Sequence, residues 1–183
     1  MNAVADKFEQ FEWLTHGITA KSPQFSDEAH GTGEKPLDYQ DRLGAIASME
    51  TQLEKSITSV IVFGESSKGD FEFIQDHLAN IMVVNAEKDN RLKPKNIELC
   101  VLANRVALMV LLFALDPEYE ANFTAKGRLY AGGIKSYEMD SEAYRKTWKQ
   151  YENLMVIALE TSIKCASGAV EKYRKNTYRE LKV

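Results

Sequence analysis

Apolar residues recur at steps of three or four along most of this 183-residue chain, with polar residues between them. This spacing places the apolar side chains on one face of an α-helix, so it predicts a mainly α-helical protein. Helices are expected over residues 5–17, from Asp38 or Asp41 to about Phe63, over residues 71–85 and 95–115, and from Asp140 or Ser141 onward. In the last of these, the apolar stripe continues as far as Tyr173.

The segment over residues 95–115 is apolar nearly all round, which is typical of a helix at the centre of a core. Its longest apolar run, residues 106–115, is too short to cross a bilayer, which requires about 20 residues. Asp116 and Pro117 end the helix because proline cannot continue its hydrogen bonding. We therefore expect a buried central helix and no membrane partner.

Residues 117–139 interrupt the helical pattern. Short alternating apolar and polar pieces flank Gly132 and Gly133. Two successive glycines readily adopt the positive φ angles of a tight hairpin turn, so a small β-hairpin is predicted for this excursion.

The N-terminal region differs from the rest of the chain. Residues 18–38 include two prolines and two glycines but few large apolar residues, a composition typical of an extended or mobile arm. The chain is therefore expected to divide into a short helix with a flexible arm over residues 1–40 and a single helical domain over residues 41–183.

Charge is distributed unevenly along the chain. Residues 1–125 contain 11 Lys and Arg against 20 Asp and Glu, whereas residues 126–183 contain 12 against 7. A cationic half on an acidic protein can mark contact with a nucleic-acid backbone. Alternatively, the two halves neutralise each other within the fold. A cationic half on one exposed face would favour DNA binding, and internal pairing would favour a protein without a DNA role.

Basic residues gather in two segments. The first precedes and opens the helix over 95–115, in an arrangement that loosely resembles a helix-turn-helix. The second covers the excursion and the start of the last helix, where cations could contact phosphates. The candidate DNA-binding residues are Arg91, Lys93, Lys95, Asn96, Lys126, Arg128, Lys135, Arg145, Lys146 and Lys149. Of the aromatic residues interleaved with the second segment, Tyr144 and Trp148 are expected in the core.

Catalytic and metal-binding patterns are absent from the sequence. The three histidines, His16, His30 and His77, lie in different segments without ligand spacing, and no paired cysteines occur. We therefore expect no enzyme activity, metal or cofactor. Cys100 and Cys165 lie within apolar helical patterns and are expected to be buried, reduced thiols, which fits a cytoplasmic location.

The chain resembles the late-gene antitermination proteins called Q, of the phage lambda type. The resemblance covers nearly the whole chain and is most specific in the N-terminal arm. Its residues are Lys21-Ser22-Pro23, Ser26-Asp27, Thr32, Leu37 and Asp41 in the arm, Ala45 and Gln52 in the next helix, Ala143-Tyr144-Arg145 after the excursion, and Tyr151, Leu154 and Val156 in the last helix.

One feature of that family is missing. The lambda-type protein carries two CxxC pairs that bind zinc on its excursion, and this chain has neither. The excursion is therefore expected to be a metal-free hairpin held by Phe123, Tyr130 and Tyr137.

The resemblance implies a phage transcription antitermination factor in the cytoplasm of a bacterial host cell. Such a protein binds double-stranded late-promoter DNA and RNA polymerase with its sigma factor, and suppresses pausing and termination. Residues 41–183 would then form the DNA- and polymerase-binding domain. The alternative is an acidic helical protein-binding module that inhibits a host enzyme without binding DNA.

Overall fold

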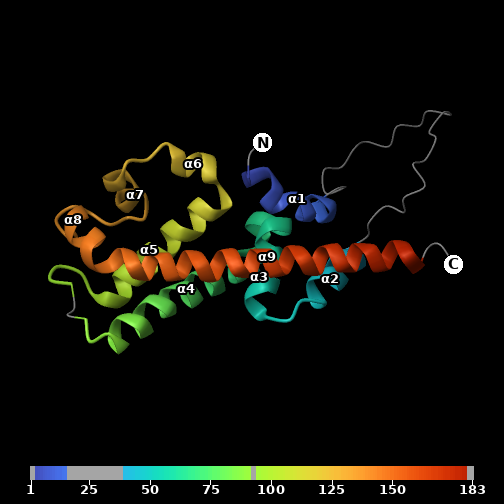
Figure 1. Cartoon of the computed structure of the whole chain (residues 1–183), viewed down its shortest axis with the longest axis horizontal. Helices are drawn as coiled ribbons and strands as arrows, with labels where there is room; N and C mark the ends of the chain where they lie inside the picture. Colours follow the sequence, from blue (N-terminus) through green and yellow to red (C-terminus); the bar gives the residue numbers. More distant parts are fainter. Residues whose placement is uncertain (1–2, 16–38, 92–93, 181–183) are drawn as a thin grey trace.

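A long C-terminal helix organises the molecule, and the longer helices pack along it (Figure 1). The computed structural model describes residues 3–15, 39–91 and 94–180. The longer helices are α1 (Ala3–Thr15), α2 (Tyr39–Ala47), α3 (Gln52–Phe63), α4 (Lys68–Lys88), α5 (Leu99–Leu115) and α9 (Lys149–Glu180). The shorter elements are a 3₁₀ turn, η1 (Gly64–Ser67), the helices α6 (Pro117–Ala121), α7 (Ala125–Ala131) and α8 (Ser141–Ala143), and a π-helical turn, η2 (Tyr144–Trp148).

The core lies between α9 and the helices α1, α3, α4 and α5, all of which contact it. Helix α9 buries a stripe with helical spacing, of which Tyr151, Met155 and Leu159 are the first members. Helix α5 buries residues on most of its circumference, as its composition predicted. The prediction of a mainly α-helical protein is confirmed.

The region expected to form one helix from Asp38 or Asp41 to Phe63 contains two. Helix α2 ends at Ala47, and α3 begins after Thr51. The Thr51 side chain accepts a hydrogen bond from the Glu54 amide, and the Glu54 side chain accepts one from the Thr51 amide. This capping box satisfies backbone donors that a new helix leaves open, so it starts α3 at this position.

The prediction of a β-hairpin in the excursion is wrong: residues 117–139 contain no strand and instead form α6, α7 and a loop. Gly133 has a positive φ of 78°, but it ends a helix. Its amide donates to the Tyr130 carbonyl, and the Ile134 amide donates to the Leu129 carbonyl. This is a Schellman motif, which needs the same left-handed residue that a hairpin turn needs.

Gly132 has a different role, because it allows α7 to approach α5 closely. A Cβ atom at this position would lie 2.9 Å from the Arg105 carbonyl oxygen and 3.0 Å from the Met109 Cβ. The two glycines of the excursion therefore serve a helix end and a helix contact.

The prediction that Phe123, Tyr130 and Tyr137 form a cluster that holds the excursion is also wrong. Phe123 contacts Phe113 and Tyr119, with ring centroids 5.7 and 4.8 Å away. Tyr130 and Tyr137 are 75% and 66% exposed and do not join this cluster. The excursion is instead held to the helical body by the contact of Phe123 with Phe113 and by the burial of Leu129 and Ile134.

Helix α1 packs on the helical body. Phe11, Trp13 and Leu14 are buried, and Arg42 of α2 donates a hydrogen bond to the Leu14 carbonyl. The expected arm over residues 18–38 lies outside the described residues. No helix in the described part of the chain is both long and apolar enough to cross a membrane.

Candidate nucleic-acid interface

The two predicted basic segments meet at one end of the molecule, where α7 and α8 lie beside the start of α5 (Figure 1). Two contacts join them. The Asn96 side-chain amide donates to the Tyr137 carbonyl at 2.8 Å, and Arg105 pairs with Glu138 at 2.7 Å. Residues 33 and 41 positions apart in the sequence therefore form one surface.

Tyr151 of α9 ties the end of α4 to the same surface. Its hydroxyl donates to Asp89 at 2.9 Å and accepts from Arg91 at 3.4 Å. Asn90 between them has a positive φ of 50°, and its amide donates to the Glu87 carbonyl. The end of α4 is thus a second left-handed cap, with asparagine in the glycine position.

Several candidate cations at this end have no carboxylate within ion-pair distance in the described residues. Lys95, Lys126 and Arg145 are exposed, and none of them is in a salt bridge there. Lys135 is also exposed, with its ammonium 5.7 Å from the centre of the Tyr137 ring. The candidate Lys93 lies outside the described residues.

Three other candidate cations, Lys146, Arg128 and Lys149, are paired with carboxylates. Lys146 lies 2.8 Å from Glu142, one helical turn earlier. Arg128 pairs with both Glu120 and Glu152, and its guanidinium lies 5.2 Å from the centre of the Phe113 ring. The charge of Arg128 is therefore directed into the protein, away from the exposed surface.

Glu152 is the centre of this internal network and is only 1% exposed. Its carboxylate accepts hydrogen bonds from the Tyr144 hydroxyl at 2.8 Å, from Arg128 at 3.0 Å and from Lys149 at 2.5 Å. Burial, followed by the adjacent Glu152 charge, raises the pKa of Tyr144. These three donors offset the cost of burying the Glu152 carboxylate away from water.

The network fastens α7 to the start of α9 through a π-helical turn. In η2 the Lys149 amide donates to the Tyr144 carbonyl five residues earlier, and Tyr144 and Trp148 are buried, as expected from the sequence. Such turns are often found at functional sites. Here the turn carries two buried aromatic side chains and the hydroxyl that reaches Glu152.

Carboxylates also lie at this end and are held in fixed positions. The Lys135 amide, followed by the Arg105 side chain, lowers the pKa of Glu138. The amides of Ala143 and Glu142 lower the pKa of Asp140, which is the N-cap of α8. Both acids therefore stay charged at neutral pH and reduce the positive potential that Lys126 and Lys135 produce.

The expectation of two buried thiols is wrong, because Cys100 and Cys165 are both exposed. Each lies on the solvent side of its helix. Within the described residues, no three His, Cys, Asp or Glu side chains form a group that could hold a metal. His16 and His30 lie outside those residues, and His77 is exposed and stacks on Phe73.

Sequence reasoning missed the exposed pair Tyr130 and Tyr137, which it placed in an aromatic cluster that holds the excursion. The available signal was that Tyr130 directly follows Arg128 and Leu129 in α7. Because Leu129 is buried, the next residue along the helix lies on a different, exposed face. The class of protein defined here is an all-α protein with a mixed basic and aromatic surface at one end. No family model matches the chain, and comparisons with curated proteins and with solved structures give no match either.

Proposed function

We propose that this protein is a phage transcription antitermination factor that binds promoter DNA and RNA polymerase and suppresses pausing and termination. The observation that carries the proposal is the convergence of two basic segments on one end of the molecule. Lys95 from the first segment and Lys126 and Lys135 from the second lie there without carboxylate partners in the described residues. Separate in sequence, they form one surface to which a phosphate backbone could bind.

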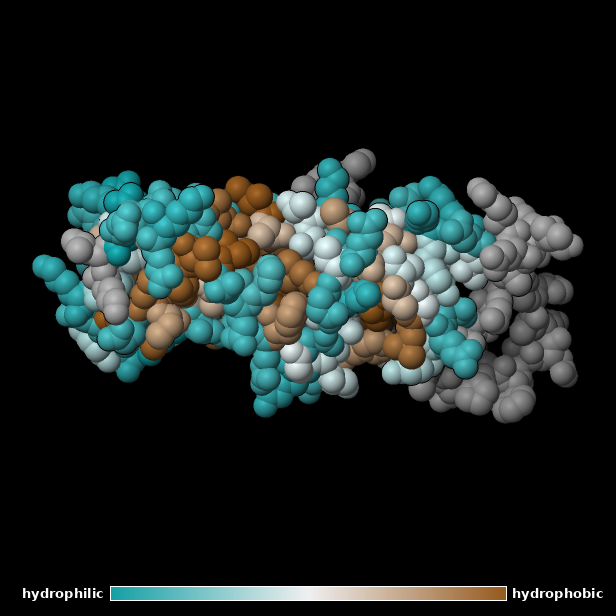
Figure 2. Space-filling view, turned by 90° about the horizontal axis from the view of Figure 1, so that it is seen from below, coloured by the Kyte–Doolittle hydropathy of each residue, from teal (hydrophilic) through white to brown (hydrophobic). Residues whose placement is uncertain are grey.

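The chemistry of this surface fits positioning on DNA better than detailed reading of bases. Exposed lysines supply phosphate contacts, which fix register and carry no sequence information. Asn96 uses its side-chain amide hydrogen to bind Tyr137, which leaves its side-chain oxygen for an outside donor. Figure 2 shows, from below, mostly hydrophilic residues at this end with a hydrophobic patch beside them.

The nearby acids set the expected strength of binding. Glu138 and Asp140 repel phosphate, so DNA affinity from this surface alone should be weak and strongly dependent on salt. Simultaneous binding to RNA polymerase would make the DNA contact intramolecular and raise its effective concentration to about the millimolar range. A weak DNA surface is therefore compatible with a protein that works on a polymerase at a promoter.

A second candidate function is an acidic protein-binding module without a DNA role. It is favoured by the internal pairing of Arg128, Lys146 and Lys149. Among the described residues, two ion pairs join the halves: Arg128 with Glu120, and Arg105 with Glu138. Lys146 and Lys149 pair within their own half, so internal neutralisation across the halves is partial.

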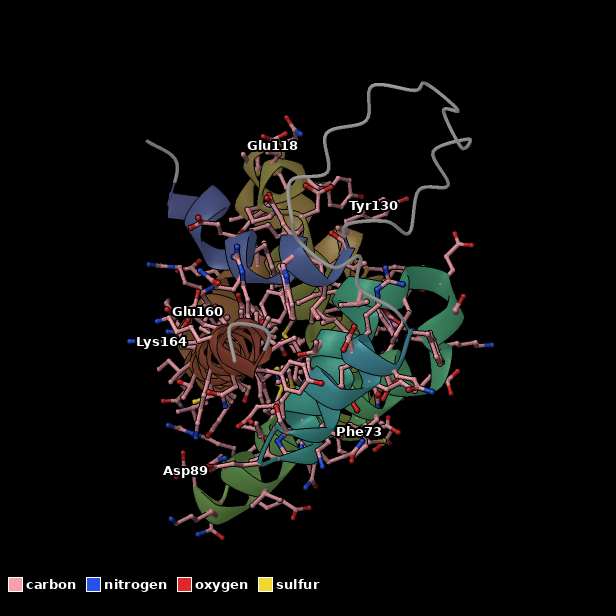
Figure 3. All side chains as sticks on the ribbon, turned by 90° about the vertical axis from the view of Figure 1, so that its right-hand side faces the viewer. Phe73, Asp89, Glu118, Tyr130, Glu160 and Lys164 are labelled. Atoms are coloured by element: carbon pink, nitrogen blue, oxygen red, sulfur yellow. The ribbon has the colours of Figure 1, made fainter. Side chains whose placement is uncertain are left out.

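The test is run-off transcription by a bacterial RNA polymerase holoenzyme, on a template from the genome that encodes the chain, with a terminator placed after the promoter. The variant Lys126→Glu with Lys135→Glu is compared with Lys164→Glu plus Lys172→Glu. Both pairs change the net charge equally, and all four side chains are exposed. Lys164 lies about 22 Å along α9 from Lys149, and it projects from a different side of the molecule than Tyr130 (Figure 3).

The proposal requires more read-through with the wild-type protein, and a loss of that effect in the Lys126 and Lys135 variant alone. A gel-shift with a duplex of the same promoter should show the same order of binding. Read-through unchanged by the wild-type protein at saturating concentration would reject antitermination. An equal loss in both variants would reject this surface as the DNA site.

A further inference from the structure

An apolar pocket lies where α1, the end of α3 and the end of α5 meet, and nothing in the proposed function uses it. Its volume is about 760 Å³, within the range of about 300–1,000 Å³ that small-molecule sites occupy. Five elements contribute to its wall: α1, α3, η1, α4 and the end of α5. The pocket is therefore built by the tertiary fold, and no single groove between two helices accounts for it.

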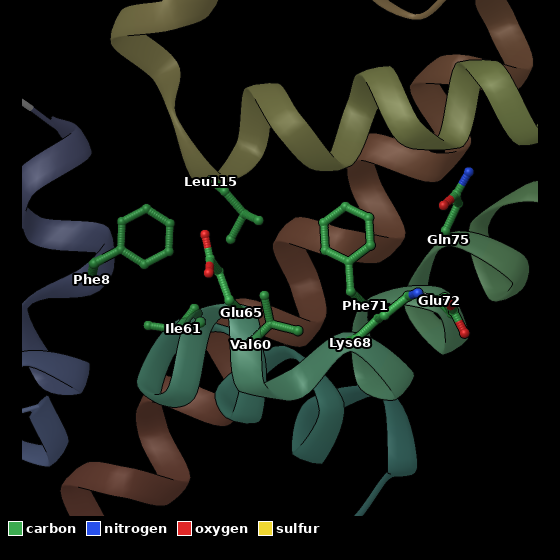
Figure 4. A pocket seen from close by; sticks show the side chains of 10 residues that line it. Phe8, Val60, Ile61, Glu65, Lys68, Phe71, Glu72, Gln75 and Leu115 are labelled. Atoms are coloured by element: carbon green, nitrogen blue, oxygen red, sulfur yellow. Dashed lines mark ion pairs between the residues drawn. The ribbon is translucent and has the colours of Figure 1, made fainter.

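Apolar side chains form most of the wall. Phe8 from α1, Phe71 from α4 and Leu115 from α5 point toward the same space (Figure 4). All three are partly buried and pack against the core on their inner side, so the surface that they show to the pocket is fixed. A ligand with an apolar body would remove this surface from water.

Polar groups lie along one side of the pocket, on η1 and the first turns of α4. Gln75 donates its amide to the Asn104 carbonyl at 3.2 Å, and Lys68 lies 3.8 Å from Glu72. Glu65 has no ion-pair partner in the described residues, and its carboxylate lies between Phe8 and Leu115 (Figure 4). The pocket thus presents one unneutralised negative charge beside an apolar wall.

Backbone geometry directs Glu65 to this place. Gly64 ends α3 with a φ of 55° and a ψ of −125°, a combination that residues with a side chain rarely adopt. The chain therefore turns sharply before η1, and the next residue is placed at the mouth of the pocket. The position of the Glu65 carboxylate therefore depends on the backbone turn at Gly64 as well as on the side-chain torsions of Glu65.

We propose that this pocket binds a small amphipathic ligand with an apolar or aromatic body and a cationic amine. The body lies against Phe8, Phe71 and Leu115, and the amine faces Glu65. Binding is driven by the apolar surface, while the carboxylate selects the charge of the head group. The site is independent of the DNA surface, because none of the candidate DNA-binding residues lines it.

Three probes share a naphthyl ring and differ in the polar group: naphthylethylamine, naphthylethanol and naphthylacetate. Titration calorimetry with the full chain should give the tightest binding for the amine and the weakest for the carboxylate. An exposed ion pair predicts that the amine binds about two- to fivefold more tightly than the alcohol at low salt. High salt should reduce this preference because it screens the pair.

The matched variants are Glu65→Gln and Glu87→Gln. Both residues are exposed, and Glu87 lies near the other end of α4, about 29 Å from its first residue. Glu65→Gln should abolish the preference for the amine over the alcohol, and Glu87→Gln should retain it. Leu115→Trp, which places a large ring in the pocket, should abolish binding of all three probes while circular dichroism shows an intact helical fold.

Three results would overturn the proposal. The first is the absence of heat for every probe at millimolar concentration, checked by saturation-transfer NMR. The second is equal binding of the amine and the carboxylate to the wild-type chain. The third is a preference for the amine that survives Glu65→Gln, since the charge selection would then come from elsewhere. These three results concern the pocket alone, so failure of the DNA experiment would not change how any of them is interpreted.

Discussion

Replacing Gly132 with alanine tests the close contact between α7 and α5. A Cβ atom at this position would lie 2.9 Å from the Arg105 carbonyl oxygen and 3.0 Å from the Met109 Cβ. Both neighbours belong to α5, which packs against α4 and α9 and cannot move without disturbing the core. The added methyl group must therefore push apart two packed helices.

The expected cost follows from two opposing terms. Inserting a methyl group into a packed interior typically costs about 1–3 kcal/mol. Replacing glycine also restricts the unfolded chain, which stabilises the fold by about 0.4–1 kcal/mol. The central values of the two terms leave Gly132→Ala destabilised by about 1.3 kcal/mol, or about 3–5 °C in melting temperature for a domain of this size.

Gly168→Ala is the matched control because it makes the same chemical change in open space. Apart from the neighbouring backbone of α9 itself, no atom of the described residues lies within 4 Å of a Cβ at this position, which is inside α9 and exposed. Alanine is favoured over glycine in a helix interior by about 0.5–1 kcal/mol. The control should therefore melt at a slightly higher temperature than the wild-type chain.

Thermal melting by circular dichroism, with urea titration for the free energy of unfolding, measures both variants. The reasoning predicts opposite signs for the two substitutions. A Gly132→Ala variant as stable as Gly168→Ala would show that α7 does not press against α5 in solution. The described packing of the excursion would then be incorrect.

Three further outcomes are expected. Trp148→Ala should lower stability by about 3–5 kcal/mol, because Trp148 is 4% exposed; an unchanged melting curve would contradict its burial. Glu152→Gln should destabilise by about 1–3 kcal/mol, a value reduced from that of a fully buried pair because Lys149 and Arg128 are partly exposed. The lowered pKa of Glu138 gives stability that is present above its ordinary pKa and is lost as pH falls. Melting at about pH 5 and pH 3 should therefore show a smaller loss in Glu138→Gln than in the wild-type chain.

The helical class and the buried stripe of α9 could be predicted because both depend on local spacing. The helix boundaries that were predicted wrongly also had local signals in the sequence. Thr51 and Glu54 have the spacing of a capping box, and they divide a pattern whose hydrophobic period continues through the break. Asp116 and Pro117 end α5, but the same pair is also the N-cap and first position of α6.

The excursion was mispredicted because one backbone requirement serves two structures. Positive φ at a glycine suits a hairpin turn and a Schellman cap equally well. The distinguishing feature was the pair of apolar residues, Leu129 and Ile134, which flank the cap and are both buried. A hairpin would have needed two alternating strands, and Lys126 to Ala131 has the composition of a helix end.

The charged surface could be predicted only in part, because sequence counts do not say which cations already have partners. Arg128 reaches Glu152, 24 residues away, only because α7 folds onto α9. A variant that reverses Arg128 together with Lys126 and Lys135 would break this buried network and weaken the fold as well as any DNA contact. Reversing Lys126 and Lys135 alone leaves the network intact. Loss of DNA binding without loss of stability in that variant therefore assigns the effect to the surface.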